Sequence, residues 1–148
     1  MIVVICGPPA TGKTTVGTLL QRRLEKRGRP VRLLDSDQFS RNTYDRLYDR
    51  VADADGDWIV TGTFYKRPWQ ARFQRLDDVF VVQLEANLET CLERNRRREE
   101  PIDDQAVHIV WREFAEPEAD LTVDVTDCPP PAVVDRIVAT LGTNLERG

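Results

Sequence analysis

Short apolar runs alternate with stretches of helical periodicity along the whole chain. Residues 2–6, 31–34, 58–60, 79–84 and 121–125 are predicted strands, and the first of them, IVVIC, is apolar throughout. A continuous apolar run is typical of a strand that is buried on both faces of a parallel sheet. Between the strands, apolar side chains recur at helical spacing, as Val16, Leu20 and Leu24 do. The pattern predicts helices over residues 13 to about 28, 39–52, 68–76, 87 to about 98, 107–114, and a last helix that includes residues 133–141.

This alternation predicts the fold class. Strands that alternate with helices form an α/β fold, here a three-layer sandwich with a five-stranded parallel sheet and helices on both faces. A length of 148 residues suits a single domain, residues 1–148. Right-handed crossovers bring the carboxyl ends of all strands to one edge, where ligands bind. We therefore look for chemistry at Gly7, at residues 35–37 and 61–63, and at Glu85.

The segment GPPATGKT, residues 7–14, matches the phosphate-loop pattern G-x-x-x-x-G-K-[ST] at every fixed position. The two glycines let the backbone curl so that its N–H groups converge, and the helix that follows adds the positive end of its dipole. Lys13 can neutralise the β- and γ-phosphates, and the Thr14 hydroxyl can ligate Mg²⁺. The motif predicts a P-loop NTPase that binds ATP with Mg²⁺ through Gly7, Pro9, Ala10, Thr11, Gly12, Lys13, Thr14 and Thr15.

Two classes of P-loop protein fit the rest of the sequence poorly. GTPases carry a base-reading N-K-x-D tetrapeptide, which the chain lacks, and mechanochemical ATPases end their third strand in acidic residues, where this chain has Thr61. A kinase remains, and Asp35-Ser36-Asp37 supports it. We predict that Asp37 holds and deprotonates the acceptor hydroxyl, or holds Mg²⁺ through water, and that Asp35 orients its neighbour or caps it. The alternative is that either acid only caps the next helix.

Arginines predict the remaining parts of the site. Four of them lie within residues 94–98, and guanidinium groups match the charge of a phosphoryl group in transfer. We predict a mobile lid over roughly residues 94–104, with Arg94 and Arg98 on one helix face as catalytic residues. The alternative is a solvated helix end that suits the helix dipole. For the acceptor side the candidates are Asp35, Asp37, Arg41, Phe64, Arg67 and Arg72, with Phe39, Tyr44, Tyr65 and Trp69 as a further stacking wall or as core.

These residues carry a resemblance to known families. The phosphate loop, LDSD at 34–37 and TGTFY at 61–65 resemble the small P-loop kinases grouped around adenylylsulfate kinase. The stretch CLERNRRR at 91–98 is more similar to the phosphoseryl-tRNA kinase branch, which includes the Elongator-associated tRNA-modification ATPase. The resemblance implies that Asp37 lies at the acceptor and that Arg94 and Arg98 are lid arginines. Thr61 departs from it, because many of these enzymes have a metal-associated Asp there, as does Ser36, which replaces a glycine.

Composition narrows the location and the partners. A net charge of −4 and a pI near 5.1 argue against a protein built for non-specific nucleic-acid binding. No apolar run approaches the ~20 residues that span a bilayer, and MIVVICG has no basic region ahead of its apolar stretch, so we expect no membrane segment, no signal peptide and a cytoplasmic protein. The three cysteines, Cys6, Cys91 and Cys128, are expected to be buried thiols, and His108 a helix-surface residue.

The sequence therefore predicts a monomeric or weakly dimeric kinase that transfers the γ-phosphoryl group of ATP to a hydroxyl group of a small polar or nucleotide-like acceptor. Two alternatives stay open. One is a nucleotide-switched ATPase or kinase that acts with tRNA, other RNA or a tRNA-modification partner. The other is a polynucleotide 5′-hydroxyl kinase, against which the acidic pI counts modestly.

Overall fold

The structure, a computed structural model, describes the backbone of residues 1–147 and the side chains of residues 1–142. The strands are β1 (Ile2–Cys6), β2 (Val31–Asp35), β3 (Asp57–Thr61), β4 (Val79–Glu85) and β5 (Leu121–Asp124). The helices are α1 (Lys13–Lys26), α2 (Thr43–Ala52), α3 (Arg67–Gln74), α4 (Leu88–Arg96), α5 (Asp104–Glu113) and α6 (Pro130–Arg147), with a short 3₁₀ helix, η1 (Ser36–Gln38), after β2.

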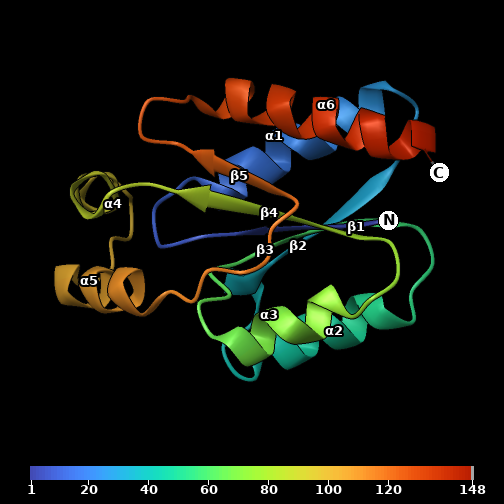
Figure 1. Cartoon of the computed structure of the whole chain (residues 1–148). Coiled ribbons are helices and arrows are strands. Elements are labelled where there is room, and N and C mark those ends of the chain that lie inside the picture. Colours follow the sequence, from blue (N-terminus) through green and yellow to red (C-terminus); the bar gives the residue numbers. More distant parts are fainter. Residues whose placement is uncertain (148) are drawn as a thin grey trace.

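All strand pairs are parallel, and the strand order is β2-β3-β1-β4-β5. Helices α1 and α6 cover one face of the sheet, and α2 and α3 cover the other (Figure 1). The predicted α/β sandwich with a five-stranded parallel sheet is confirmed.

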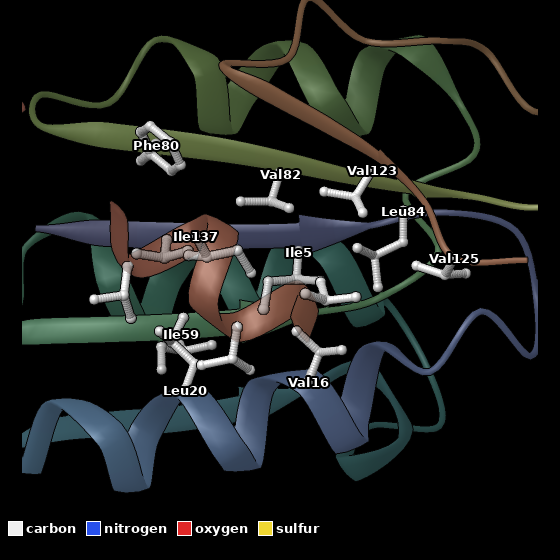
Figure 2. Packing of buried hydrophobic residues seen from close by; sticks show 14 of the residues in the cluster. Ile5, Val16, Leu20, Ile59, Phe80, Val82, Leu84, Val123, Val125 and Ile137 are labelled. Carbon is white, nitrogen blue, oxygen red and sulfur yellow. The ribbon is translucent and has the colours of Figure 1, made fainter. Parts of the chain in front are cut away.

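Alternating side chains of β1 supply two separate cores. Val3 and Ile5 point to the side of α1 and α6, where they pack with Leu20 and Ile137 (Figure 2). Val4 points to the opposite side, into the cluster under α2 and α3. Both faces of the strand are therefore buried, which explains why the sequence of β1 shows no polar position.

Several predicted boundaries differ from the structure by a few residues, and the start of α2 differs most. The helix expected over residues 39–52 begins at Thr43, because the residues after β2 form η1 instead. The Asp35 carboxylate accepts a hydrogen bond from the Asp37 N–H at 2.8 Å, and the Gln38 side chain accepts one from the Asp35 N–H at 2.9 Å. This reciprocal cap stabilises a tight turn at the end of β2 and delays the helix.

The carboxyl ends of the strands form the functional edge of the sheet. Helices α4 and α5 lie beyond the ends of β4 and β5 rather than on a face of the sheet (Figure 1). Strand order reverses at β1, whose neighbours are β3 and β4, so the loop after β1 opens at the switch point where α/β folds bind ligands. Among the described residues no helix has the length and apolar character needed to cross a membrane.

Candidate active site

The loop between β1 and α1 is shaped by two glycines. Gly7 has φ 153°, and a Cβ there would meet the Leu84 carbonyl oxygen at 2.3 Å, so no other residue fits this turn. Gly12 has φ 89° and precedes the first residue of α1. The Thr11 hydroxyl donates to the Pro8 carbonyl at 2.9 Å and fixes the curl from inside. The loop therefore has the concave form predicted from its motif.

Lys13 lies in this loop and forms no ion pair with any carboxylate of the described residues. Its Nζ donates to the Pro8 carbonyl at 2.7 Å. Burial lowers the pKa of Lys13 to about 8, and the positive charge of Arg98 acts in the same direction, whereas Asp35 acts against it. A buried amine beside a cation is the arrangement that a bound polyanion would stabilise. The site therefore favours a phosphate chain on electrostatic grounds.

Asp35 joins three elements at the edge of the sheet. Its Oδ2 accepts from the Thr14 hydroxyl at 2.5 Å and from the Thr61 hydroxyl at 2.8 Å, while its Oδ1 caps η1. The capping role predicted for Asp35 is confirmed, and the structure adds the two threonine contacts. Thr61, at the end of β3, therefore contributes a donor to the carboxylate that β2 supplies.

The oxygens of Thr14 and Asp35 fit a magnesium ion. Mg²⁺ prefers a few hard oxygen ligands from the protein and fills its other positions with water and substrate phosphates. A hydroxyl and a carboxylate in contact beside a phosphate loop supply such a partial set. No cluster of three or more His, Cys, Asp or Glu side chains that could hold a metal occurs in the described part of the chain.

A cavity of about 470 Å³ opens over these residues. The phosphate loop follows β1, the middle strand. Residues after β2 and β3, with α2 and α3, line the cavity on one side of it, and α4, α5 and the segment between them line it on the other. The lining residues are Pro9, Ala10, Gly12, Lys13, Thr14, Thr15, Asp35, Ser36, Asp37, Tyr44, Gly62, Thr63, Tyr65, Trp69, Arg94, Arg98, Ile102 and Val110.

The structure brings Asp37, Arg94 and Arg98 to the cavity with the phosphate loop, in different ways. The Asp37 carboxylate is exposed to it, and within the described residues it makes no side-chain hydrogen bond. Arg98 is exposed and its charge is felt at Lys13. Arg94 donates from Nη2 to the Val125 carbonyl at 2.7 Å and to the Thr126 carbonyl at 3.5 Å. That guanidinium therefore ties α4 to the segment after β5.

The arginines predicted for the acceptor side lie elsewhere. Arg41 and Arg67 are exposed, and Arg72 pairs with Asp45 at 2.5 Å and lies 4.0 Å over the Tyr48 ring. None of the three lines the cavity within the described residues, so the structure does not bring them together with the other predicted site residues. Long side chains on α2 and α3 extend toward solvent and toward each other, and sequence spacing does not reveal this.

Phe64 is a second correction. Its side chain is 1% exposed and packs on Phe73 with ring centroids 5.0 Å apart, so it belongs to the core. Its φ of 49° and the hydrogen bond from its N–H to the Tyr44 hydroxyl, 3.0 Å, turn the ring inward. Of the proposed stacking wall, Tyr44, Tyr65 and Trp69 do line the cavity, whereas Phe39 does not within the described residues.

Sequence reasoning missed two apolar residues of the cavity. Ile102 and Val110 line the cavity, and Ile102 is 42% exposed. Asn95, fully buried, holds this segment: its Nδ2 donates to the Ile102 carbonyl at 2.6 Å and its Oδ1 accepts from the Ile102 N–H at 3.1 Å. An asparagine inside a run of arginines was the available signal. Cys6 and Cys91 are buried thiols as expected, Cys128 is half-buried, and His108 is exposed on α5.

Comparisons with known proteins fit this geometry. Residues 1–52 match the model of a family described as chromatin associated protein KTI12. The search of curated proteins found no match. A gluconokinase from Sinorhizobium meliloti 1021 has a similar structure, with a TM-score of 0.78 and 16% identity over 98% of this chain and 93% of that chain.

Two further solved structures are also similar. The APS kinase CysC of Mycobacterium tuberculosis, in complex with AMPPNP and APS, gives a TM-score of 0.76 and 20% identity over 95% of this chain and 96% of that chain. A shikimate kinase from Aquifex aeolicus gives 0.69 and 21% over 100% of both chains. The chain has the fold of the small P-loop kinases, as the sequence resemblance implied.

Proposed function

We propose that this protein is an ATP-dependent kinase that phosphorylates a hydroxyl group of a small polar or nucleotide-like acceptor. The observation that carries the proposal is one cavity lined both by the phosphate loop and by Asp37, whose carboxylate makes no side-chain hydrogen bond within the described residues. The solved kinases of the same fold, named for gluconate, shikimate and APS, support this class of reaction.

The residues divide the reaction between them. Lys13 and the loop N–H groups bind the phosphate chain, and Thr14 with Asp35 would hold Mg²⁺, which supplies charge neutralisation at the phosphates. The acceptor oxygen forms a bond to the γ-phosphorus while the bond from that phosphorus to the β–γ bridging oxygen breaks, so ADP leaves. Asp37 accepts the hydroxyl proton. Arg98 stabilises charge on the transferred group.

Residues 94–104 would act as the lid. Arg98 and Ile102 reach the cavity from this segment. Asn95, on α4, holds Ile102 by hydrogen bonds, and Arg94 ties α4 to the residues after β5. Closure would bring a cation and an apolar side chain over the phosphates and exclude water, which favours transfer to the acceptor over hydrolysis.

Transfer of labelled γ-phosphate to pools of metabolites, nucleotides and oligonucleotides tests the proposal. We expect Lys13→Ala to abolish transfer, and Asp37→Asn to lower kcat by about 10²–10⁴-fold while nucleotide binding is kept. Lys26→Ala, at an exposed lysine on the same helix, is the matched control and should transfer normally. Normal turnover of Lys13→Ala would refute the assignment.

A second candidate is an ATPase whose nucleotide state controls binding to RNA or to a protein partner. The match of residues 1–52 to a family described as chromatin associated protein KTI12 is compatible with such a partner-dependent role. ATP hydrolysis that rises with added RNA or partner, without any phosphorylated product, would identify this function. A labelled product would identify the kinase.

A further inference from the structure

The side of the cavity at the ends of β2 and β3 has a distinct composition. We call Asp37, Tyr44, Thr63, Tyr65 and Trp69 the acceptor wall; they come from the ends of β2 and β3 and from α2 and α3. The wall offers aromatic rings, one hydroxyl group of a threonine and one free carboxylate. It contains no arginine, lysine or histidine.

The cations that line the cavity lie in the phosphate loop and on the α4 side, across β1 from the acceptor wall. Lys13 is bound to the Pro8 carbonyl, Arg94 to the Val125 carbonyl, and Arg98 lies close enough to Lys13 to affect its ionisation. These three groups therefore serve the phosphate chain and the start of α4. An acceptor at the wall would meet the negative charge of Asp37 first.

The rings of the wall are fixed against one another. Tyr44 stacks on Trp69 with centroids 4.4 Å apart, and Tyr65 meets Trp69 edge-on at 5.3 Å. The Tyr44 hydroxyl accepts from the Phe64 N–H, which links the rings to the loop after β3. Such a preorganised surface binds the flat apolar side of a ring at little entropic cost.

Lys66 contacts the same rings from outside the cavity. Its Nζ lies 5.1 Å from the Trp69 centroid and 5.7 Å from the Tyr65 centroid, and the residue is exposed. It is not a lining residue. Its ammonium contacts the ring faces from the solvent side, so Lys66 is neither a ligand for an acceptor anion nor needed to hold the wall, whose rings pack on one another.

We infer, on the basis of the proposed kinase function, that the acceptor is an uncharged or cationic hydroxyl compound with an apolar ring face, of the kind found in glycosides and amino sugars. A carboxylate, sulfate or phosphate on the acceptor would lie beside Asp37 without the guanidinium fork that such anions require. A neutral ring packs on Tyr65 and Trp69, and an ammonium group gains from both the carboxylate and the rings.

Charge separation of natural acceptors tests the inference. A small-molecule ultrafiltrate of bacterial and yeast extracts is divided on an anion-exchange resin, and each fraction is incubated with the protein and γ-labelled ATP. Phosphoryl transfer confined to the unbound fraction is the expected result. Transfer in the resin-bound fraction, alone or to an equal extent, overturns the inference and leaves the kinase function standing. Transfer in neither fraction overturns both.

Two variants check that the wall makes this selection. Lys66→Met should keep at least half of the transfer to the unbound fraction, and a loss of more than about tenfold would show that Lys66 binds an acceptor anion and overturn the inference. Trp69→Leu should raise the KM for the acceptor at least about fivefold with ATP affinity unchanged. An unchanged KM in a variant that folds normally also counts against it.

Discussion

Asp35→Ala removes the carboxylate that joins β2, β3 and α1. The wild-type group accepts three hydrogen bonds, from the Thr14 hydroxyl, the Thr61 hydroxyl and the Asp37 N–H. The three donors lose their partner in different surroundings. Thr14 is exposed and turns to water at little cost, whereas the Thr61 residue is 1% exposed and its hydroxyl cannot.

The structure sets the size of the effect. A buried donor left without a partner costs about 1–3 kcal/mol. Loss of the cap of η1 adds about 1 kcal/mol. We therefore expect Asp35→Ala to lower the free energy of unfolding by about 2–4 kcal/mol. Magnesium-dependent nucleotide binding should weaken as well, because Asp35 is one of the two proposed ligand groups.

Urea unfolding followed by circular dichroism measures the change, and two variants interpret it. Adding Thr61→Val to Asp35→Ala removes the orphaned hydroxyl and should recover at least about 1 kcal/mol. Asp37→Ala, which removes an exposed carboxylate two residues away, should stay within about 0.5 kcal/mol of wild type while it loses turnover. An unchanged unfolding midpoint for Asp35→Ala, or no recovery with Thr61→Val, would refute the reasoning.

Three further predictions concern the core and the ionisation of the site. Gln70→Leu should lower stability by about 1–3 kcal/mol in urea unfolding, because the buried Gln70 amide donates to the carbonyls of Phe64, at 2.7 Å, and Ala115. Gly17→Ala should destabilise the protein by about 1–2 kcal/mol, because the added Cβ would lie 2.7 Å from Thr61 Cγ2. The control Gly142→Ala, whose Cβ would meet no atom of the described residues within 4 Å, should be neutral or stabilising. Equal effects of the two substitutions would contradict this prediction. Burial lowers the pKa of Lys13 to about 8, and bound triphosphate should raise this pKa again. ATP affinity should therefore fall as the pH rises above about 8, and calorimetry should detect proton uptake on binding. A constant affinity up to about pH 10 would contradict this prediction.

The sequence predicted the parts of the site that depend on local geometry. The phosphate loop needs two glycines, a lysine and a hydroxyl at fixed spacing, and the structure shows these residues in the expected curl between β1 and α1. Asp37 also reaches the cavity, because its place just after a strand puts it at the carboxyl edge of any parallel sheet.

The acceptor side could not be predicted in the same way. Arg72 and Phe64 have the composition of a binding site, but an ion pair with Asp45 occupies the first and the core takes up the second. Which way a long or aromatic side chain turns depends on neighbours from distant parts of the chain, and those neighbours are absent from its local pattern. Ile102 is the opposite case: its sequence suggests no site residue, but hydrogen bonds to the Asn95 side chain hold it over the cavity.

The sequence by itself therefore determined the layers of the sheet, the phosphate loop and the edge at which chemistry occurs, because hydrophobic period and glycine spacing act over a few residues. Only the tertiary structure decided the strand order, the contact of Asp35 with Thr14 and Thr61, and the aromatic, arginine-free character of the acceptor wall. These features arise where separate elements meet, and their energies come from burial and pairing between residues that are far apart in the chain.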